Sequence, residues 1–198
     1  MSANTYLTPE ERAVLESARD GIAGAGGLGT NCAMHLVRAG VQHLTVVDFD
    51  VVNESNLNRQ FFFRDQLGQK KVEALKENLL RIDPDADIRA VDAKIDAASV
   101  KEIFADCDIV VEAFDVVDAK VMLVSSFASS GKNLVTASGL AGWGQSNEMR
   151  VRKMGNIVAV GDGETAVGAN AAPASPRVGI AAAMQANAVV SLLLGCEP

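Results

Sequence analysis

The sequence predicts an α/β fold with a doubly wound, mostly parallel sheet, a C-terminal antiparallel hairpin and a final apolar helix. Three observations favour this class. Strand-like and helix-like segments alternate along most of the chain, which is typical of a parallel sheet with right-handed crossovers. A run of β-branched residues within 107–115 has the composition of a strand covered on both faces. The pattern changes after Gly139, where alternating segments flank a Gly-Asn pair, a signal for a hairpin turn.

The chain opens with a predicted helix inside an N-terminal arm, residues 1–19. Thr8 is placed to cap this helix, Pro9 suits its first position, and Glu11 completes a capping box. We expect the arm to pack on the edge of the main domain.

A strand, a glycine turn, a helix and a second strand are predicted between residues 21 and 50. The glycines of the turn are Gly24, Gly26, Gly27 and Gly29. Three of them have the G-x-G-x-x-G spacing, which permits a tight turn and lets a phosphate approach the helix N-terminus. Asp48 ends the second strand, where a carboxylate can reach a ribose hydroxyl. This unit makes the fold Rossmann-like and indicates a nucleotide, most often a dinucleotide such as NAD.

The later elements follow from periodicity and from residues that stop or start a helix. We expect helices at 69–81, 97–104 and 118–130, strands at 88–91, 107–115 and 133–137, and a hairpin at 148–160 turning at 154–156. The segment 161–176 is rich in Gly, Ala and Pro and is predicted to be a mobile loop. The last helix should begin with Ser175 as N-cap and Pro176 at its first position, and end at Gly195.

Length and composition predict a single folded unit over residues 1–198, since 48% of the residues are hydrophobic. Its parts are the arm at 1–19, a nucleotide-binding core at 20–138, and a closing part at 139–198. A net charge of −7 argues against nucleic acid or an anionic membrane as a partner. The polar N-terminus lacks a secretory signal, so we expect a cytoplasmic protein. The apolar run 178–194 carries Gln185 and Asn187, which favours a buried helix over a membrane span.

A polar loop of about twenty residues follows Asp48 and is longer than a dinucleotide fold needs. It brings Arg59 and Lys71 towards the carboxyl ends of the strands, where open α/β sheets bind ligands. Arg59 can grip phosphate oxygens as a fork and Lys71 can act as a point charge. Asp115 ends a neighbouring strand and can hold Mg²⁺ against a triphosphate, or merely cap the next helix. Together these groups indicate phosphoryl or nucleotidyl transfer.

Five ordered motifs resemble the ThiF/MoeB family of ubiquitin-activating-type adenylating enzymes. They are residues 24–29, 47–50, 55–60, 68–72 and 114–115, and the last helix adds 176–179 and 184–186. The resemblance implies ATP-dependent adenylation of the C-terminal glycine of a ubiquitin-like sulfur carrier protein, in this branch the carrier of thiamine synthesis. A sulfur donor and a homodimer are further expectations.

The resemblance also implies roles for single residues. Asp48 would bind the ribose; Asn56, Arg59 and Lys71 would bind the phosphates; Asp115 would bind Mg²⁺. Gln60 would support the phosphate site, and Asp50 would join the nucleotide site or simply hold its loop. A glycine carboxylate is already ionised at pH 7, so the reaction needs alignment and charge neutralisation rather than a general base.

Departures from the family pattern limit what is expected. The three cysteines, Cys32, Cys107 and Cys196, form no C-x-x-C pair, so we expect reduced thiols and no zinc. The segment 138–147 has no cysteine, which leaves covalent sulfur transfer by this chain unsupported. Arg12 or Arg19 could replace the family's N-terminal arginine that reaches a partner subunit. Three alternatives stay open: an enzyme that adenylates another small carboxylate or a tRNA-linked one, like the tRNA threonylcarbamoyladenosine dehydratases; a NAD-binding redox protein; and an inactive carrier-binding module.

Overall fold

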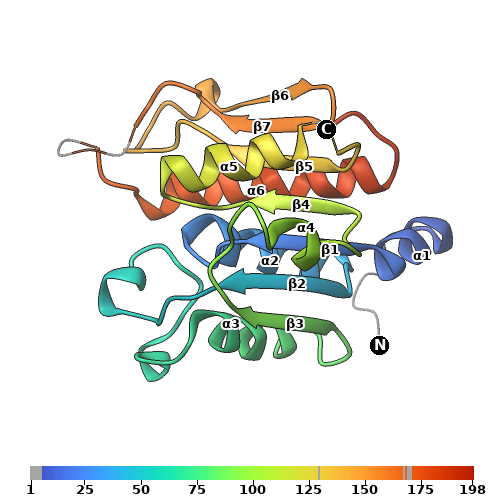
Figure 1. Cartoon of the computed structure of the whole chain (residues 1–198), viewed down its shortest axis with the longest axis horizontal. Helices are drawn as coiled ribbons and strands as arrows, with labels where there is room; N and C mark the ends of the chain where they lie inside the picture. Colours follow the sequence, from blue (N-terminus) through green and yellow to red (C-terminus); the bar gives the residue numbers. More distant parts are fainter. Residues whose placement is uncertain (1–5, 129, 167, 169–170) are drawn as a thin grey trace.

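The computed structural model describes residues 6–128, 130–166, 168 and 171–198. One seven-stranded sheet crosses the described chain in the order β3-β2-β1-β4-β5-β7-β6 (Figure 1). Its strands are β1 (Arg19–Ala23), β2 (His43–Asp48), β3 (Asp87–Asp92), β4 (Ile109–Glu112), β5 (Asn133–Ala137), β6 (Arg150–Met154) and β7 (Ile157–Gly161). The pairings are parallel except between β6 and β7. The Rossmann-like, mostly parallel sheet with a C-terminal antiparallel pair is therefore confirmed.

Helices cover both faces of this sheet, as a doubly wound fold requires. One face packs against α2 (Gly27–Ala39), α3 (Lys71–Leu80) and α6 (Ser175–Leu193), whose buried side chains share one core with the sheet. The other face packs against α4 (Val100–Ile103) and α5 (Val117–Phe127) around a smaller core. The chain reverses its direction of winding between β3 and β4, so the carboxyl ends of β1 and β4 border a crevice where such folds bind ligands.

The N-terminal helix α1 (Pro9–Ser17) has the predicted cap. The Glu11 amide donates to the Thr8 hydroxyl at 3.2 Å, and the Thr8 amide donates to the Glu11 carboxylate at 2.8 Å. Leu15 is buried and joins α1 to the larger core. The predicted arm also includes residues 1–5, which lie outside the described residues.

Two departures from the predicted helix bounds have an identifiable cause. The short helix expected at 97–104 is reduced to α4, because the Asp96 carboxylate accepts hydrogen bonds from the amides of Ala98 and Ser99 and turns the chain first. The last helix begins at Ser175 with Ala174 as its N-cap, so Ser175 is not the cap and Pro176 lies one position further in. The amide of Val178 donates to the Ala174 carbonyl at 3.0 Å, and this bond sets the start.

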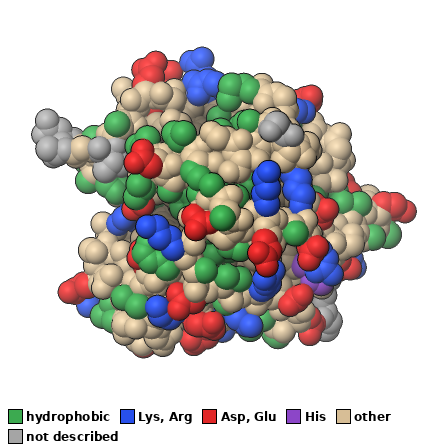
Figure 2. Space-filling view, in the orientation of Figure 1, with side chains coloured by type: hydrophobic (Ala, Val, Ile, Leu, Met, Phe, Trp, Pro, Cys, Tyr) green, Lys and Arg blue, Asp and Glu red, His purple; other side chains and the backbone are tan. Residues whose placement is uncertain are grey.

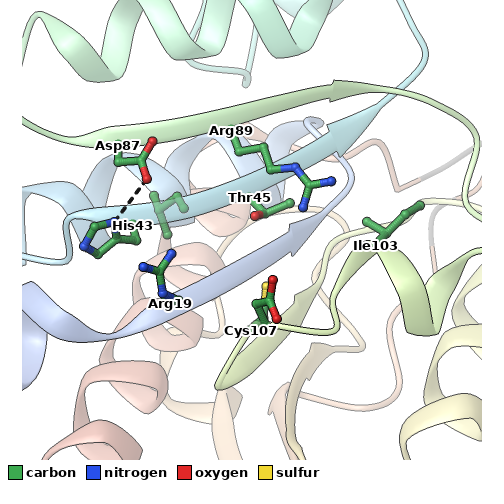
Figure 3. Close-up of a pocket in the computed structure, with 9 residues that line it drawn as sticks. Arg19, His43, Thr45, Asp87, Arg89, Ile103 and Cys107 are labelled. Atoms are coloured by element: carbon green, nitrogen blue, oxygen red, sulfur yellow. Dashed lines mark hydrogen bonds and ion pairs between the residues drawn. The ribbon is translucent and has the colours of Figure 1, made fainter.

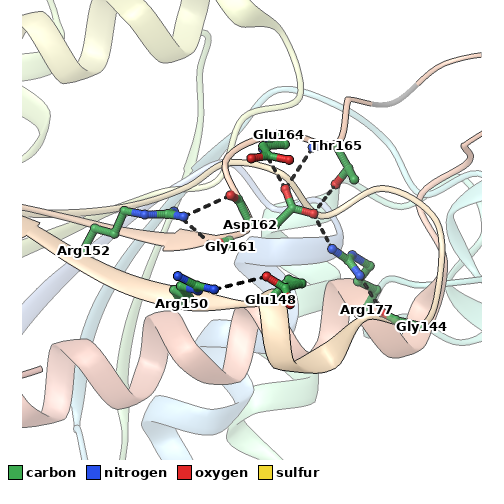
Figure 4. A network of polar contacts seen from close by, with 9 residues as sticks. All are labelled: Gly144, Glu148, Arg150, Arg152, Gly161, Asp162, Glu164, Thr165 and Arg177. Carbon is green, nitrogen blue, oxygen red and sulfur yellow. Dashed lines mark hydrogen bonds and ion pairs between the residues drawn. The ribbon is translucent and has the colours of Figure 1, made fainter.

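The closing part is held by a buried ion pair between Asp162, directly after β7, and Arg177 of α6 (Figure 4). The Arg177 guanidinium, 2% exposed, donates to the Asp162 carboxylate and to the carbonyl of Gly144. Asp162 also accepts hydrogen bonds from the amides of Glu164 and Thr165 and from the Thr165 hydroxyl. These bonds fix the start of the segment predicted as a mobile loop. Residues 167, 169 and 170 of that segment lie outside the described residues.

Asp20 is an acid buried in the core, with no ion pair to any of the described residues. It lies in β1, is fully buried, and neither carboxylate oxygen has a hydrogen-bond partner among the described residues. Burial, with a contribution from the charge of Asp108, raises the pKa of Asp20 to about 7, and the nearby backbone amide of Ile109 opposes this by a smaller amount. Asp20 therefore stays protonated in the folded state at a pH where the unfolded chain has released the proton.

We expect the free energy of unfolding to fall as pH rises from about 4 to about 7, because only the unfolded state ionises Asp20 in that window. The Asp20→Asn variant cannot ionise there, so it should be more stable than wild type by about 2 kcal/mol at pH 8. This is about half of the full linkage, since the ionised group can draw water to itself. Below pH 4 the advantage should vanish. Urea unfolding of wild type and Asp20→Asn at pH 4 and at pH 8 measures the stability difference between them. An equal difference at the two pH values would contradict the prediction.

Candidate nucleotide-binding site

The glycine turn lies between the carboxyl end of β1 and α2, as the sequence predicts. Gly24 has φ +106°, a left-handed conformation, and its amide donates to the Val47 carbonyl at 2.8 Å. A Cβ on Gly29 would lie 1.8 Å from the Gly24 carbonyl oxygen. These two glycines therefore serve the tight turn and the close packing of α2 on β1.

Gly26 and Gly27 form the N-terminus of α2 and have a different environment. Gly26 is the N-cap and makes no side-chain cap hydrogen bond. A Cβ on Gly26 would meet no atom closer than the Gln60 amide nitrogen at 4.0 Å, whereas one on Gly27 would lie 3.2 Å from the Arg59 side chain. The helix N-terminus thus faces open space bordered by the predicted phosphate ligand Arg59 and by Gln60, which was predicted to support the phosphate site. Such a place suits an anion.

The predicted ribose residue, Asp48, connects the glycine turn to the loop after β2. One carboxylate oxygen accepts from the Ala25 amide at 2.7 Å and the other accepts from the Asp50 amide at 2.8 Å. Each oxygen keeps a free lone pair for a hydroxyl donor. The position of Asp48 at the end of β2 is as expected, and its contact with a ribose stays a prediction.

Lys71 begins α3 and is held by the same loop. Its ammonium donates to the Asp50 carboxylate at 2.8 Å, and its amide donates to the Asp50 carbonyl at 3.0 Å. Lys71 is 7% exposed while Asp50 is half exposed. Asp50 therefore holds the lysine beside the carboxyl edge, and its own exposed carboxylate adds negative charge there.

Arg59 and Gln60 are positioned by two helix residues that sequence reasoning missed. The Asn31 side chain on α2 donates to the Arg59 carbonyl at 2.9 Å, and the Phe61 amide donates to the Thr30 hydroxyl at 3.0 Å. The Arg59 guanidinium donates to two neighbours within its own loop, at 3.2 and 2.8 Å. The signal in the sequence is a Thr-Asn pair directly after Gly29, where polar side chains can reach the adjoining loop.

The remaining predicted ligands are Asn56 and Asp115. Asn56 closes a turn, since its side-chain oxygen accepts from the Asn53 amide at 2.9 Å. Asp115 is exposed, three residues past β4, and within the described part of the chain its side chain has no hydrogen bond or ion pair. The N-cap of α5 is Val116, so the alternative role of Asp115 as that cap is not supported. Phe114 contacts the position of a Cβ on Gly24 at 3.3 Å, which places the Asp115 loop beside the glycine turn.

Two cavities are lined by none of the predicted ligands. One of about 140 Å³ is at the amino ends of the strands, lined by residues that include Arg19, His43 and Arg89 (Figure 3). The other, of about 290 Å³, lies beside the Asp162 network (Figure 4). The glycine turn is at the carboxyl ends of β1 and β2, so the first cavity is at the opposite end of these strands from the predicted ligands.

Comparison with known proteins decides the family. The family model described as "ThiF family" matches residues 3–198. The chain belongs to the ThiF family. Curated relatives of this ThiF-family chain include the molybdopterin-synthase adenylyltransferase of Escherichia coli (strain K12), 32% identical over 190 residues, with 91% of this chain and 75% of the relative covered. The resemblance stated from the motifs is therefore confirmed.

Other ThiF-family relatives are longer than this chain. "Adenylyltransferase and sulfurtransferase UBA4" of Eremothecium gossypii is 37% identical over 132 residues, which cover 66% of this chain and 30% of the relative. The "SAMP-activating enzyme E1" of Haloferax volcanii is 40% identical over 108 residues, which cover 54% of this chain and 40% of the relative. The aligned part of this chain thus spans less than half of these two relatives.

Among solved structures, the E. coli tRNA N6-threonylcarbamoyladenosine dehydratase TcdA in complex with ATP has a TM-score of 0.88 at 21% identity, with 98% of this chain and 92% of that chain covered. E. coli MccB with ATP has a TM-score of 0.74 at 22% identity, with 95% of this chain and 60% of that chain covered. At these identities the likeness shows the shared fold.

The residues at the carboxyl edge fit a nucleoside triphosphate. The helix N-terminus is open at Gly26, and the buried side-chain oxygen of Gln60 has no hydrogen-bond partner within the described residues. The Arg59 side chain borders this N-terminus at Gly27, and the Lys71 ammonium is bound to Asp50 in the loop after β2. The described residues contain no group of three or more His, Cys, Asp or Glu that could hold a metal. Mg²⁺ can be held by one carboxylate together with substrate phosphates, and Asp115 offers that carboxylate.

Proposed function

We propose that this ThiF-family chain is an ATP-dependent adenylyltransferase that activates the C-terminal glycine carboxylate of a ubiquitin-like sulfur carrier protein and releases pyrophosphate. The observation that carries the proposal is that the loop after β2 is bonded to the glycine turn through Asp48 and holds the Lys71 ammonium through Asp50. The Arg59 side chain and Phe114, the residue before Asp115, border the same turn. The names of curated relatives support it, since they include two kinds of adenylyltransferase and an E1 activating enzyme.

The chemistry needs alignment and charge neutralisation. The attacking glycine carboxylate is ionised at neutral pH, so no side chain has to remove a proton from it. Lys71 and Arg59 would bind phosphate oxygens and stabilise the charge that develops there and on the pyrophosphate. Asp48 would bind the ribose, and Asn56 and Gln60 would complete the phosphate site. Asp50 would hold Lys71 in one side-chain conformation, so Lys71 would lose less conformational entropy when ATP binds.

Asp115 is the residue we assign to Mg²⁺. Its carboxylate is exposed beside the glycine turn and is uncommitted to other side chains within the described residues. When bound, Mg²⁺ would supply positive charge between phosphate groups. We expect no zinc, because the chain lacks the paired cysteines of a zinc site.

The finer assignments are also part of the proposal. The carrier would be that of thiamine biosynthesis, a separate sulfur donor would act after adenylation, and the working form would be a cytoplasmic homodimer of single-domain chains spanning residues 1–198. Among the described residues, no helix has the length and apolar character needed to cross a membrane.

A second candidate is a dehydratase-like enzyme that adenylates a tRNA-linked carboxylate. The TM-score of 0.88 with TcdA favours the shared fold. The net charge of −7 disfavours a tRNA substrate. On the face in Figure 2, Lys and Arg side chains are interspersed with Asp and Glu instead of forming one stripe.

The deciding experiment is ATP–pyrophosphate exchange with candidate carriers. Exchange should appear with an intact carrier and disappear when its terminal glycine is deleted. A parallel thermal-shift titration should show stabilisation by ATP and none by NAD, which separates the proposal from a redox protein. Carrier binding without exchange would instead indicate an inactive binding module.

Lys71→Ala is expected to lower the exchange rate by roughly 10²–10³-fold, because it removes a cation placed for the developing phosphate charge. The matched control is Lys70→Ala, since Lys70 is a half-exposed neighbour paired with Asp92 at 3.1 Å. The control should retain most of the activity, and both variants should melt near the wild-type temperature. Full activity of Lys71→Ala would remove Lys71 from the site.

Gly26→Ala should separate binding from folding. The nearest atom to the added Cβ would be 4.0 Å away and Gly26 has φ −89°, so stability should change by less than about 1 kcal/mol. The methyl group would occupy the space that a phosphate needs at the helix N-terminus, so ATP affinity should fall at least roughly tenfold. Calorimetric titration with ATP measures the affinity, and unchanged affinity would place the phosphates elsewhere.

A further inference from the structure

A buried acid, Glu112, precedes the proposed Mg²⁺ residue Asp115 by three positions in the chain. Glu112 is the last residue of β4 and is fully buried. A buried carboxylate is costly unless it is paired and hydrogen-bonded, so its partners show what it does in the fold. Sequence reasoning missed this residue because the strand around it is apolar.

The Glu112 carboxylate joins three elements. One oxygen accepts from the Phe114 amide at 2.8 Å. The other accepts from the Lys120 ammonium on α5 and from the Thr136 hydroxyl on β5. Lys120 also donates to the Ala137 carbonyl at 2.9 Å. A fourth element, α6, is joined through the main chain, since the Gln185 amide group donates to the Glu112 carbonyl at 2.9 Å.

These bonds bracket Asp115 from both sides. Phe114, the residue before it, is tied to Glu112 through its amide. The first turn of α5 follows it, and Lys120 ties that helix to Glu112 and to β5. Asp115 has no partner of its own among the described side chains, so the position of its carboxylate depends on how these flanking residues are held. A loose loop would have to be ordered when a metal binds, at a cost in affinity.

We propose that the Glu112–Lys120 pair is a positioning device that holds the Asp115 carboxylate in place for a divalent cation. This inference rests on the proposed function, because it assumes that Asp115 meets Mg²⁺. Glu112 and Lys120 act through the loop, and their buried atoms do not touch the nucleotide. Replacement of such supporting groups typically weakens metal affinity while the ligand itself is kept.

The test uses the double variant Glu112→Gln/Lys120→Met in the full-length protein. It removes both charges together, so no unpaired charge is left in the core. The Mg²⁺ concentration for half-maximal pyrophosphate exchange should rise roughly tenfold, while the rate at saturating Mg²⁺ stays within about threefold of wild type. A second readout is hydrogen exchange without ligand, in which the Phe114 amide should lose protection. A variant at the far edge of the sheet, Lys153→Met, should change neither readout.

Thr136→Val tests the same network without touching a charge. It is nearly isosteric, removes one hydrogen bond to Glu112, and should raise the Mg²⁺ requirement by about threefold, a smaller effect than in the double variant. A wild-type Mg²⁺ requirement in the double variant, or in Thr136→Val should the double variant not fold, would overturn the inference. Asp115→Asn distinguishes failure of the proposed metal site from failure of the positioning role. Its full activity would overturn the proposed metal site itself, whereas its inactivity with an unchanged double variant would overturn the positioning role alone.

Discussion

Gly29→Ala is expected to destabilise the protein by about 4 kcal/mol or more, a large part of the roughly 5–15 kcal/mol that stabilises an ordinary domain. The added Cβ would lie 1.8 Å from the Gly24 carbonyl oxygen and 3.1 Å from the Ile22 side chain. Real atoms cannot approach so closely, and the first contact is with backbone that cannot rotate away. The structure could accept the methyl group only by moving α2 off β1, which would open the packed core between them.

The matched control for Gly29 is Gly179, another glycine on a core helix. It lies in α6, and a Cβ there would meet no atom within 4 Å. Gly179→Ala should therefore stabilise the protein by about 0.5–1 kcal/mol, since alanine favours the helix and restricts the unfolded chain. Urea unfolding of both variants gives the comparison. Equal stability of Gly29→Ala and wild type would contradict the close packing of α2 on β1 at this position.

The secondary structure was predictable where a local pattern and the final packing agree. The glycine turn, the capping box at Thr8, and the strand at Asn133–Ala137 depend on residues that are neighbours in the sequence. The apolar face of α3 was also visible in the spacing of Val72, Leu75 and Leu79, and these three side chains are buried. In each case the sequence alone contains the physical cause.

The supporting shell of the site was less predictable, because its partners are distant in sequence. Glu112 bonds to a helix and a strand that follow it, and no periodicity indicates these pairings. The one available signal was an acid inside an apolar strand, since such a group has to find a partner. Asp20 is also an acid inside an apolar strand, but its carboxylate has no hydrogen-bond partner among the described residues. The signal alone therefore does not predict a partner. The Arg59 tether through Asn31 required the fold to bring α2 beside the loop.

Arg177→Ala is expected to lower the free energy of unfolding by about 3–5 kcal/mol. The guanidinium is 2% exposed and bonds to the Asp162 carboxylate, which is 8% exposed. Its loss would leave a buried negative charge without its counter-charge, and the hydrogen bonds from Glu164 and Thr165 compensate for part of that loss. An exposed pair provides the control: Arg150 and Glu148 approach to 3.2 Å with 63% and 57% of their side chains exposed. Arg150→Ala should cost less than about 1 kcal/mol.

The difference in free energy of unfolding between wild type and Arg177→Ala should depend on pH, and this dependence measures its electrostatic part. Burial alone would raise the pKa of Asp162, but hydrogen bonds from Thr165 and Glu164, together with the charge of Arg177, lower it to about 2. Because the pKa of Asp162 is lower in the folded state than in the unfolded chain, ionised Asp162 stabilises the fold at a pH above the unfolded pKa. That stabilisation is lost as pH falls from about 4 to about 2. The gap between wild type and Arg177→Ala in urea unfolding should therefore narrow over this window. A gap that stays constant down to pH 2 would show that Arg177 stabilises α6 by packing rather than by its charge.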